Sequence, residues 1–173
     1  MKTKQSQTDN TTLAEAFLTF GRQYNVAANI LIDLDDSLDV PIYYLFSHSI
    51  ELLFKAYLRC LGESIPMGKA GHDLPGFLNA CKDCGLVVDL DLWNVVELLN
   101  SENSQMYGYR YPNSCSASRP ALPFLQPVAN QLLDRISAIL KAKATPNLSD
   151  QAVAIKLIWG QPRKRTDLPA TGQ

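Results

Sequence analysis

The chain has 173 residues, of which 46% are hydrophobic and 19% are charged, the balance of a folded globular domain rather than of a disordered chain. Its formal net charge is −1, so it lacks the overall positive field with which many proteins attract nucleic acids or anionic membranes. Any contact with a nucleic acid must therefore come from a local patch of residues.

The sequence contains no stretch typical of export or of membrane insertion. Its first ten residues are polar, and no run approaches the roughly 18 apolar residues of a membrane span. We therefore expect a soluble, cytoplasmic protein without membrane contact. In a reducing compartment its four cysteines are expected to be free thiols: Cys60, Cys81, Cys84 and Cys115.

Residues 1–10 are expected to form a flexible tail, followed by the first helix. Thr12 and Glu15 have the spacing of a capping box, in which a hydroxyl and a carboxylate satisfy free amides at a helix start. From there to about Asp36, apolar residues recur every three or four positions, which predicts a buried helix face. The residues of this predicted face are Leu13, Phe17, Phe20, Tyr24, Ala27 and Leu31.

The second helix is expected to run from a cap at Asp39, with Pro41 in its first turn, to a stop at Gly62. Apolar residues surround this segment on almost all sides, which predicts the central and most buried helix.

Three shorter apolar patterns predict three further helices. The third begins at a cap on Asp73 and ends at Gly85, the fourth begins at Asp89 or Asp91, and the last covers about residues 122–143. Loops rich in glycine, proline or serine separate them. Together these patterns predict an all-α protein, an up-and-down bundle of four or five helices.

We expect this bundle to span residues 11–143 and a C-terminal extension to cover residues 144–173. The extension contains an apolar patch, Ala152–Trp159, and a basic run, Arg163-Lys164-Arg165. The patch is expected to pack against the bundle or a second copy, which suggests a homodimer. The basic run is either a solvated tail or a phosphate contact.

Three polar residues share one face of the second predicted helix. His48, Glu51 and Lys55 are spaced three and four apart, and Glu51 and Lys55 form an i, i+4 pair. They form either a solvated strip with a weak salt bridge or the lining of a ligand groove with acid–base potential. His72, before the third helix, either closes the loop or contacts an anion at the helix N-terminus.

A second candidate site combines aromatic and basic residues. Tyr109, Arg110 and Tyr111 suit base stacking with a phosphate contact, although a packed helix end has the same composition. Cys81 and Cys84 form a single C-x-x-C without a second ligand pair, so we interpret them as core residues and predict no metal site. We also predict no cofactor.

Three segments carry a resemblance to a known family. Residues 47–58, SHSIELLFKAYL, place a polar pair before a glutamate and a Lys-Ala, and Gly71-His72-Asp73-Leu74 would open the next helix. Tyr109-Arg110-Tyr111-Pro112 follows later. In this order and spacing they resemble the HEPN superfamily of small helical proteins.

The resemblance implies a four-helix bundle, often homodimeric, from toxin–antitoxin or phage-defence systems. Some members of the family cut RNA, and others bind nucleotides or pair with a nucleotidyltransferase. The cutting members use an arginine, four to six residues and then a histidine, but no arginine stands at that spacing before His48 or His72. Arg110 has no histidine after it.

The leading hypothesis is therefore a HEPN-like module that binds a nucleotide, RNA, a nucleotidyltransferase or a second copy, without the family's ribonuclease activity. Its ligand-binding residues would be His48, Glu51, Lys55, His72, Tyr109, Arg110 and Tyr111. One alternative is a metal-independent ribonuclease whose rearranged site uses Arg110 with His48 or His72. Another is a purely structural partner of a second protein.

Overall fold

The computed structural model describes residues 2–35, 38–66, 68–103 and 119–144. These ranges form five α-helices and one short 3-10 helix, without a strand, which confirms the prediction of an all-α bundle. No helix within them is both long enough and apolar enough to cross a membrane. The elements are α1 (Lys2–Leu34), α2 (Asp39–Leu61), η1 (Gly68–His72), α3 (Leu74–Asp83), α4 (Leu90–Asn103) and α5 (Leu122–Ala144).

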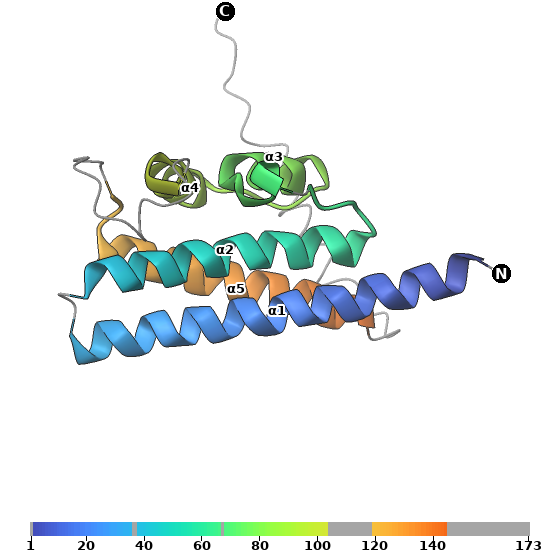
Figure 1. Cartoon of the computed structure of the whole chain (residues 1–173), viewed down its shortest axis with the longest axis horizontal. Helices are drawn as coiled ribbons and strands as arrows, with labels where there is room; N and C mark the ends of the chain where they lie inside the picture. Colours follow the sequence, from blue (N-terminus) through green and yellow to red (C-terminus); the bar gives the residue numbers. More distant parts are fainter. Residues whose placement is uncertain (1, 36–37, 67, 104–118, 145–173) are drawn as a thin grey trace, which may run out of the picture.

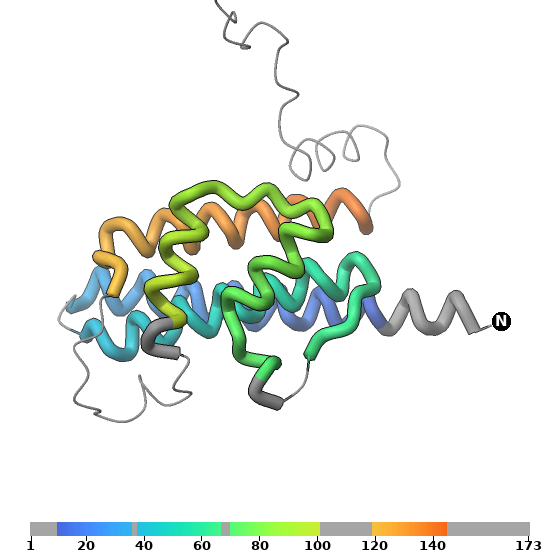
Figure 2. The backbone as a smooth tube through the Cα atoms, turned by 90° about the horizontal axis from the view of Figure 1, so that it is seen from above, coloured from blue at the N-terminus to red at the C-terminus, as the bar shows by residue number. Residues whose placement is uncertain are grey.

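The helices form two layers (Figure 1). Three long helices, α1, α2 and α5, lie side by side along the long axis, with α1 antiparallel to the other two (Figures 1 and 2). The shorter α3 and α4 cover α2 and α5 on the side away from α1, and α4 crosses the long helices rather than running along them. The bundle is therefore up-and-down only in its long helices.

Helix α2 supplies the largest share of the core between these layers, in keeping with its sequence. Its side chains are buried on nearly every side, and those with the least exposure include Ile42, Phe46, Ile50, Leu53, Phe54 and Tyr57. Gly62 ends the helix in the left-handed conformation, with a φ of 85°, and its amide donates to the carbonyl of Arg59. The predicted stop at Gly62 is confirmed.

Helix α1 buries small residues most deeply, while Phe17 and Leu31 of the predicted apolar stripe are partly buried against the core. Its buried positions are Ala14, Gly21, Asn25 and Ala28. By contrast, Phe20 is 54% exposed and Leu13 is also exposed, so the prediction is wrong for these two residues.

Close approach of α1 to α2 explains this choice of residues. A Cβ atom at Gly21 would lie 3.2 Å from Leu53 Cδ2. The hydroxyl of Ser49 donates a 2.8 Å hydrogen bond to the Gly21 carbonyl across the same contact. Two helix backbones this close leave no room for large side chains between them.

Two helix starts differ from the prediction, and a third agrees with one of the two caps that the sequence left open. Helix α1 begins at Lys2, so residues 2–10 are helical and Thr12 is not its cap. Helix α2 begins at Asp39 with Leu38 in the cap position, while the Asp39 carboxylate pairs with Arg119 at 3.2 Å. Helix α4 is capped by Asp89, whose Oδ1 accepts a 2.9 Å hydrogen bond from the amide of Leu92.

An amide network joins α1 to α5. Asn29 Nδ2 donates to Asn130 Oδ1 at 3.0 Å, and Gln126 Nε2 donates to Asn29 Oδ1 at 2.8 Å. Asn29 also donates to Asn25 Oδ1 within α1, at 2.9 Å. Because each amide needs its particular partner, the network sets the register between the first and last described helices.

Candidate functional site

A buried carboxylate stands at the centre of the candidate site. Glu51 lies on α2 with only 4% of its side chain exposed. Its Oε1 accepts a 2.7 Å hydrogen bond from Lys55 Nζ, and its Oε2 lies 3.2 Å from His72 Nδ1. We call these three residues the Glu51 cluster. A buried charge is tolerated only when it is paired, and here both carboxylate oxygens have a partner.

The predicted pair of Glu51 and Lys55 is thus present, but it is not a solvated strip. Lys55 is only 12% exposed, and its ammonium lies 5.3 Å from the centre of the Phe77 ring on α3. The ammonium is neutralised by Glu51 and covered by an aromatic face. Lys55 therefore offers little surface to an anionic ligand and acts mainly as a counter-charge.

His72 is the part of the Glu51 cluster that solvent can reach, because 45% of its side chain is exposed. An ionised carboxylate can only accept, so the Nδ1 next to Glu51 carries a proton. In the neutral ring Nε2 is then left as an acceptor. A carboxylate-oriented imidazole of this kind can bind a donor or transfer a proton.

The short helix η1 brings His72 to Glu51 from a distant part of the sequence. Gly71 lets this turn pass close to the preceding segment, since a Cβ there would lie 3.0 Å from the Pro66 carbonyl oxygen. Asp73 occupies the cap position of α3, as predicted, but makes no capping hydrogen bond. Its carboxylate turns over Gly76, where a Cβ atom would collide with Oδ2.

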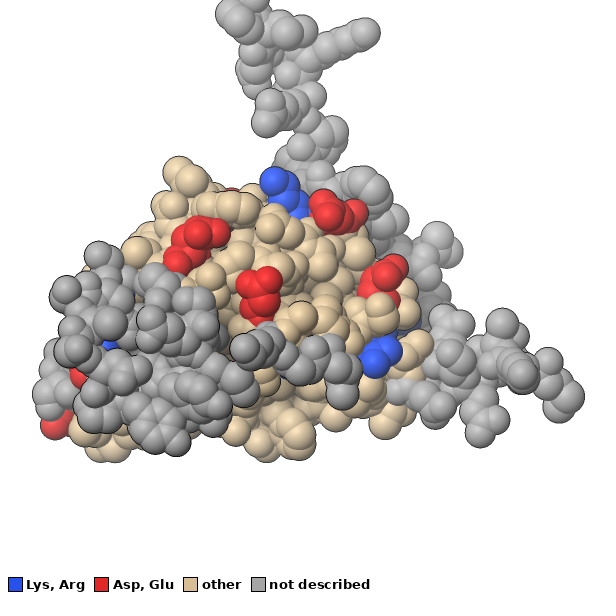
Figure 3. All heavy atoms as spheres, turned by 45° about the horizontal axis from the view of Figure 1, so that its top comes forward, with Lys and Arg blue, Asp and Glu red and all other residues tan. Residues whose placement is uncertain are grey.

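A groove that the sequence did not predict lies beside this turn. It has a volume of about 380 Å³ between the end of α2, the segment after it and α3. Figure 3 shows acidic side chains exposed on the side of the molecule where α3 and α4 lie. The groove is lined by Leu58, Glu63, Ser64, Pro66, Ala70, Asp73, Gly76, Phe77, Ala80, Asp83 and Cys84.

Cys81 and Cys84 have protonated thiols in this environment. Burial raises the pKa of Cys81 well above its ordinary value, and Cys84 raises it further. Burial also raises the pKa of Cys84, together with the nearby carboxylates of Glu63 and Asp83. Metal binding and nucleophilic attack require thiolates, so this environment opposes both. The described part of the chain contains no group of three metal-binding side chains.

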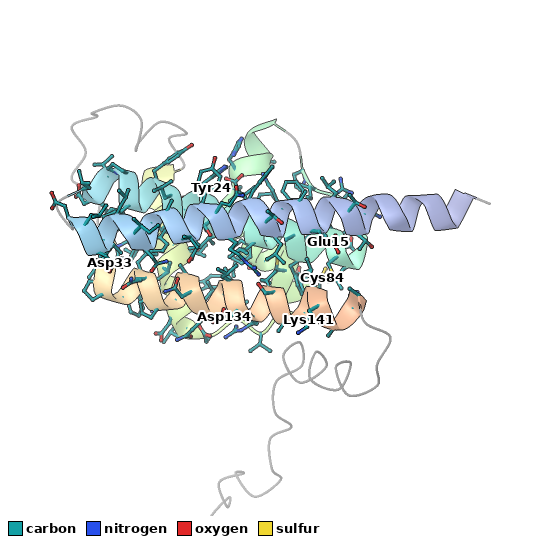
Figure 4. All side chains as sticks on the ribbon, turned by 90° about the horizontal axis from the view of Figure 1, so that it is seen from below. Glu15, Tyr24, Asp33, Cys84, Asp134 and Lys141 are labelled. Atoms are coloured by element: carbon teal, nitrogen blue, oxygen red, sulfur yellow. The ribbon has the colours of Figure 1, made fainter. Side chains whose placement is uncertain are left out.

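His48 has a different set of contacts from the Glu51 cluster. Its ring meets the edge of Tyr24 with ring centres 4.5 Å apart and stacks on Tyr44 at 6.0 Å. Tyr24 is labelled in the C-terminal half of α1 in Figure 4. The ring contacts of this half-buried histidine therefore join α1 to α2, in keeping with a packing role.

The remaining candidate residues lie outside the described ranges. They are Tyr109, Arg110 and Tyr111, together with the apolar patch Ala152–Trp159 and the basic run Arg163-Lys164-Arg165. Their ligand contacts stay predictions.

Comparisons of this chain with protein-family models, with curated proteins and with solved structures found no significant match.

Proposed function

We propose that this chain is a HEPN-like binding module of a nucleotide- or RNA-linked stress, toxin–antitoxin or phage-defence system, without the family's ribonuclease activity. One observation carries the proposal. Two separate segments of the resemblance, residues 47–58 and Gly71-His72-Asp73-Leu74, meet at the buried carboxylate of Glu51. If the chain shares the family's fold, motifs that are far apart in sequence should lie close together in space. The contact between His72 and Glu51 meets this expectation.

The module binds its ligand through His72 and the segment Tyr109-Arg110-Tyr111 rather than through the buried lysine. His72 supplies a hydrogen-bonding imidazole, and Tyr109, Arg110 and Tyr111 supply aromatic faces and a guanidinium that suit bases and phosphates. The proposed setting is cytoplasmic, and the proposed protein partners are a second copy of the chain and a nucleotidyltransferase. The absence of an Arg-x4-6-His motif from the sequence supports binding without cleavage.

The purified protein is expected to bind single-stranded RNA in a salt-dependent manner and not to cleave it in the presence of a chelator. Without metal, cleavage needs an acid or base close to a cation that stabilises the developing phosphate charge. Arg110→Ala should weaken binding about tenfold, because it removes a phosphate contact beside stacking tyrosines. Fluorescence anisotropy and gel analysis of labelled RNA measure the two results.

Arg22→Ala is the matched control, because it removes an equal charge from the exposed surface of α1. It should change RNA affinity by less than about twofold. Cleavage that both Arg110→Ala and His72→Ala abolish would instead establish the alternative, a ribonuclease with a rearranged site. Absence of both binding and cleavage would contradict the RNA-linked function and leave a protein partner.

A second copy is the proposed partner for α1. Val26, Ile30 and Leu34 are exposed and four residues apart, so they share one side of the helix, and Phe20 adds a further exposed ring. Exposed apolar side chains gathered on one helix are typical of an interaction surface. This surface supports the homodimer independently of Ala152–Trp159.

We expect a homodimer by light scattering, and we expect Phe20→Ser with Ile30→Ser to shift it to monomer. Removing two apolar contacts from such an interface should raise the dissociation constant by at least about tenfold. Leu90→Ser, at the exposed start of α4, is the control and should leave the mass unchanged. A wild-type monomer at working concentration would contradict the dimer.

A further inference from the structure

The groove beside α3 has an apolar floor and charged walls. Leu58 and Phe77 form its floor, and their side chains belong to the core. Glu63, Asp73 and Asp83 also line it, and each is exposed. The groove is therefore suited to a ligand with an apolar part and positive charges.

None of the three groove carboxylates belongs to an ion pair among the side chains that the structure describes. Each ion pair there involves other acidic side chains: Glu51, Asp39 or Asp89. The potential in the groove is also negative enough for Glu63 and Asp83 to raise the pKa of the Cys84 thiol, after the larger effect of burial. Like charges that line one groove repel one another, so a cationic occupant relieves an unfavourable arrangement.

The arrangement fits an extended cation better than a single metal ion. The groove carboxylates come from three separate positions of the chain and do not form a metal-binding group with the neighbouring histidine and cysteine side chains. A volume of about 380 Å³ accommodates several side chains of a peptide. Lysine and arginine side chains also have apolar stems that can lie on the floor while their charged ends reach the walls.

We propose that this groove binds residues 157–165 of the same chain. This segment has the complementary pattern: Leu157, Ile158 and Trp159 are apolar, and Arg163, Lys164 and Arg165 carry three positive charges. It thus offers three cations to three carboxylates and apolar side chains to an apolar floor. Bound in this way, the basic run is neutralised and withheld from other anions.

The chain leaves the described structure at Ala144, at the end of the bundle where the groove lies. Helix α5 ends at Ala144, and Lys143 Nζ donates to the Cys60 carbonyl at 3.3 Å, near the end of α2. Figure 4 places Lys141, near the end of α5, at the same end of the bundle as Cys84. Arg163 follows Ala144 by 19 residues, and a flexible chain of that length typically spans about 24 Å. The basic run can therefore reach the groove without rearrangement of the bundle.

The first test uses a labelled synthetic peptide of residues 157–167 and the full-length protein. A chain carrying Arg163→Gln, Lys164→Gln and Arg165→Gln has a vacated groove, so it should bind the peptide about fivefold more tightly than the wild type. Adding Glu63→Gln, Asp73→Asn and Asp83→Asn to this chain should weaken binding at least about fivefold. Fluorescence anisotropy measures both changes.

Asp134→Asn in the same vacated chain is the matched control, because it removes a carboxylate from the exposed side of α5, away from the groove (Figure 4). Its affinity for the peptide should be unchanged. Equal peptide affinity of the wild-type and vacated chains would overturn the proposal, and so would affinity that does not depend on the groove carboxylates.

A second test identifies the occupant. A carbodiimide joins a lysine amine to a carboxylate as an amide with loss of water, and mass spectrometry locates the bond. We expect Lys164 to couple to Glu63, Asp73 or Asp83. In a mixture of unlabelled and isotope-labelled chains, the coupled peptides should come from one chain. Mixed peptides would assign the groove to a second copy and overturn the intrachain occupant, and coupling elsewhere would overturn the site itself.

Discussion

Glu51→Ala is expected to lower the free energy of unfolding by about 3–5 kcal/mol, because it leaves a buried charge without its partner. The substitution removes both contacts of the Glu51 cluster and strands the Lys55 ammonium, which is only 12% exposed and has the Phe77 ring beside it. It also releases His72 and with it the start of α3. Urea denaturation followed by circular dichroism measures the change.

The control replaces both members of the buried pair. Glu51→Leu with Lys55→Met keeps similar volumes without charge, so its stability should lie within about 1–2 kcal/mol of the wild type. If Glu51→Ala were as stable as the wild type, the carboxylate would not hold the cluster together. If the double variant is stable but loses RNA affinity, the cluster orients His72 for binding rather than merely supporting the fold.

Gly21→Leu is expected to destabilise the protein by about 2–3 kcal/mol through overpacking. A Cβ at this position would already lie 3.2 Å from Leu53 Cδ2 and 3.4 Å from Leu52 Cβ. The larger side chain must push α1 away from α2 and weaken the hydrogen bond from Ser49 to the Gly21 carbonyl. Thermal unfolding at a fixed protein concentration measures this effect.

Two further variants separate packing from helix propensity. Gly21→Ala should stay within about 1 kcal/mol of the wild type, because its gain in helix propensity offsets the tight contact with Leu53. Gln23→Leu, on the exposed side of α1, adds the same side chain without a steric clash and should be nearly neutral. Equal losses from Gly21→Leu and Gln23→Leu would contradict a close contact between the helices.

The sequence predicts the helices well because each has a local signal. Gly62 ends α2 in the left-handed conformation, and the carboxylate of Asp89 caps the start of α4, both at predicted positions. The face predicted for α1 is only partly right: Phe17 and Leu31 pack against the core, but the fully buried positions are small residues such as Ala14 and Ala28, which give no hydrophobic stripe. Their burial depends on how closely α2 approaches, which is a property of the pair of helices and not of either one.

The candidate site is predictable only in part, for the same reason. The pair of Glu51 and Lys55 follows from helical spacing, but the contact with His72 depends on the path of η1. The groove carboxylates are even harder to foresee. Glu63, Asp73 and Asp83 come from a loop, a cap position and a helix end. Because they do not share one helix, no helical periodicity in the sequence shows that they line one groove.

The amide network between α1 and α5 has a consequence for the order in which the protein folds. Asn29 and Asn130 are separated by 101 positions, whereas α1 and α2 are neighbours in the chain. On the ribosome, α1 and α2 can associate early, but the amide of Asn29 has no α5 to meet until almost the whole bundle has been synthesised. Until then, the side of α1 that will face α5 is open to chaperones and to premature association with other nascent chains.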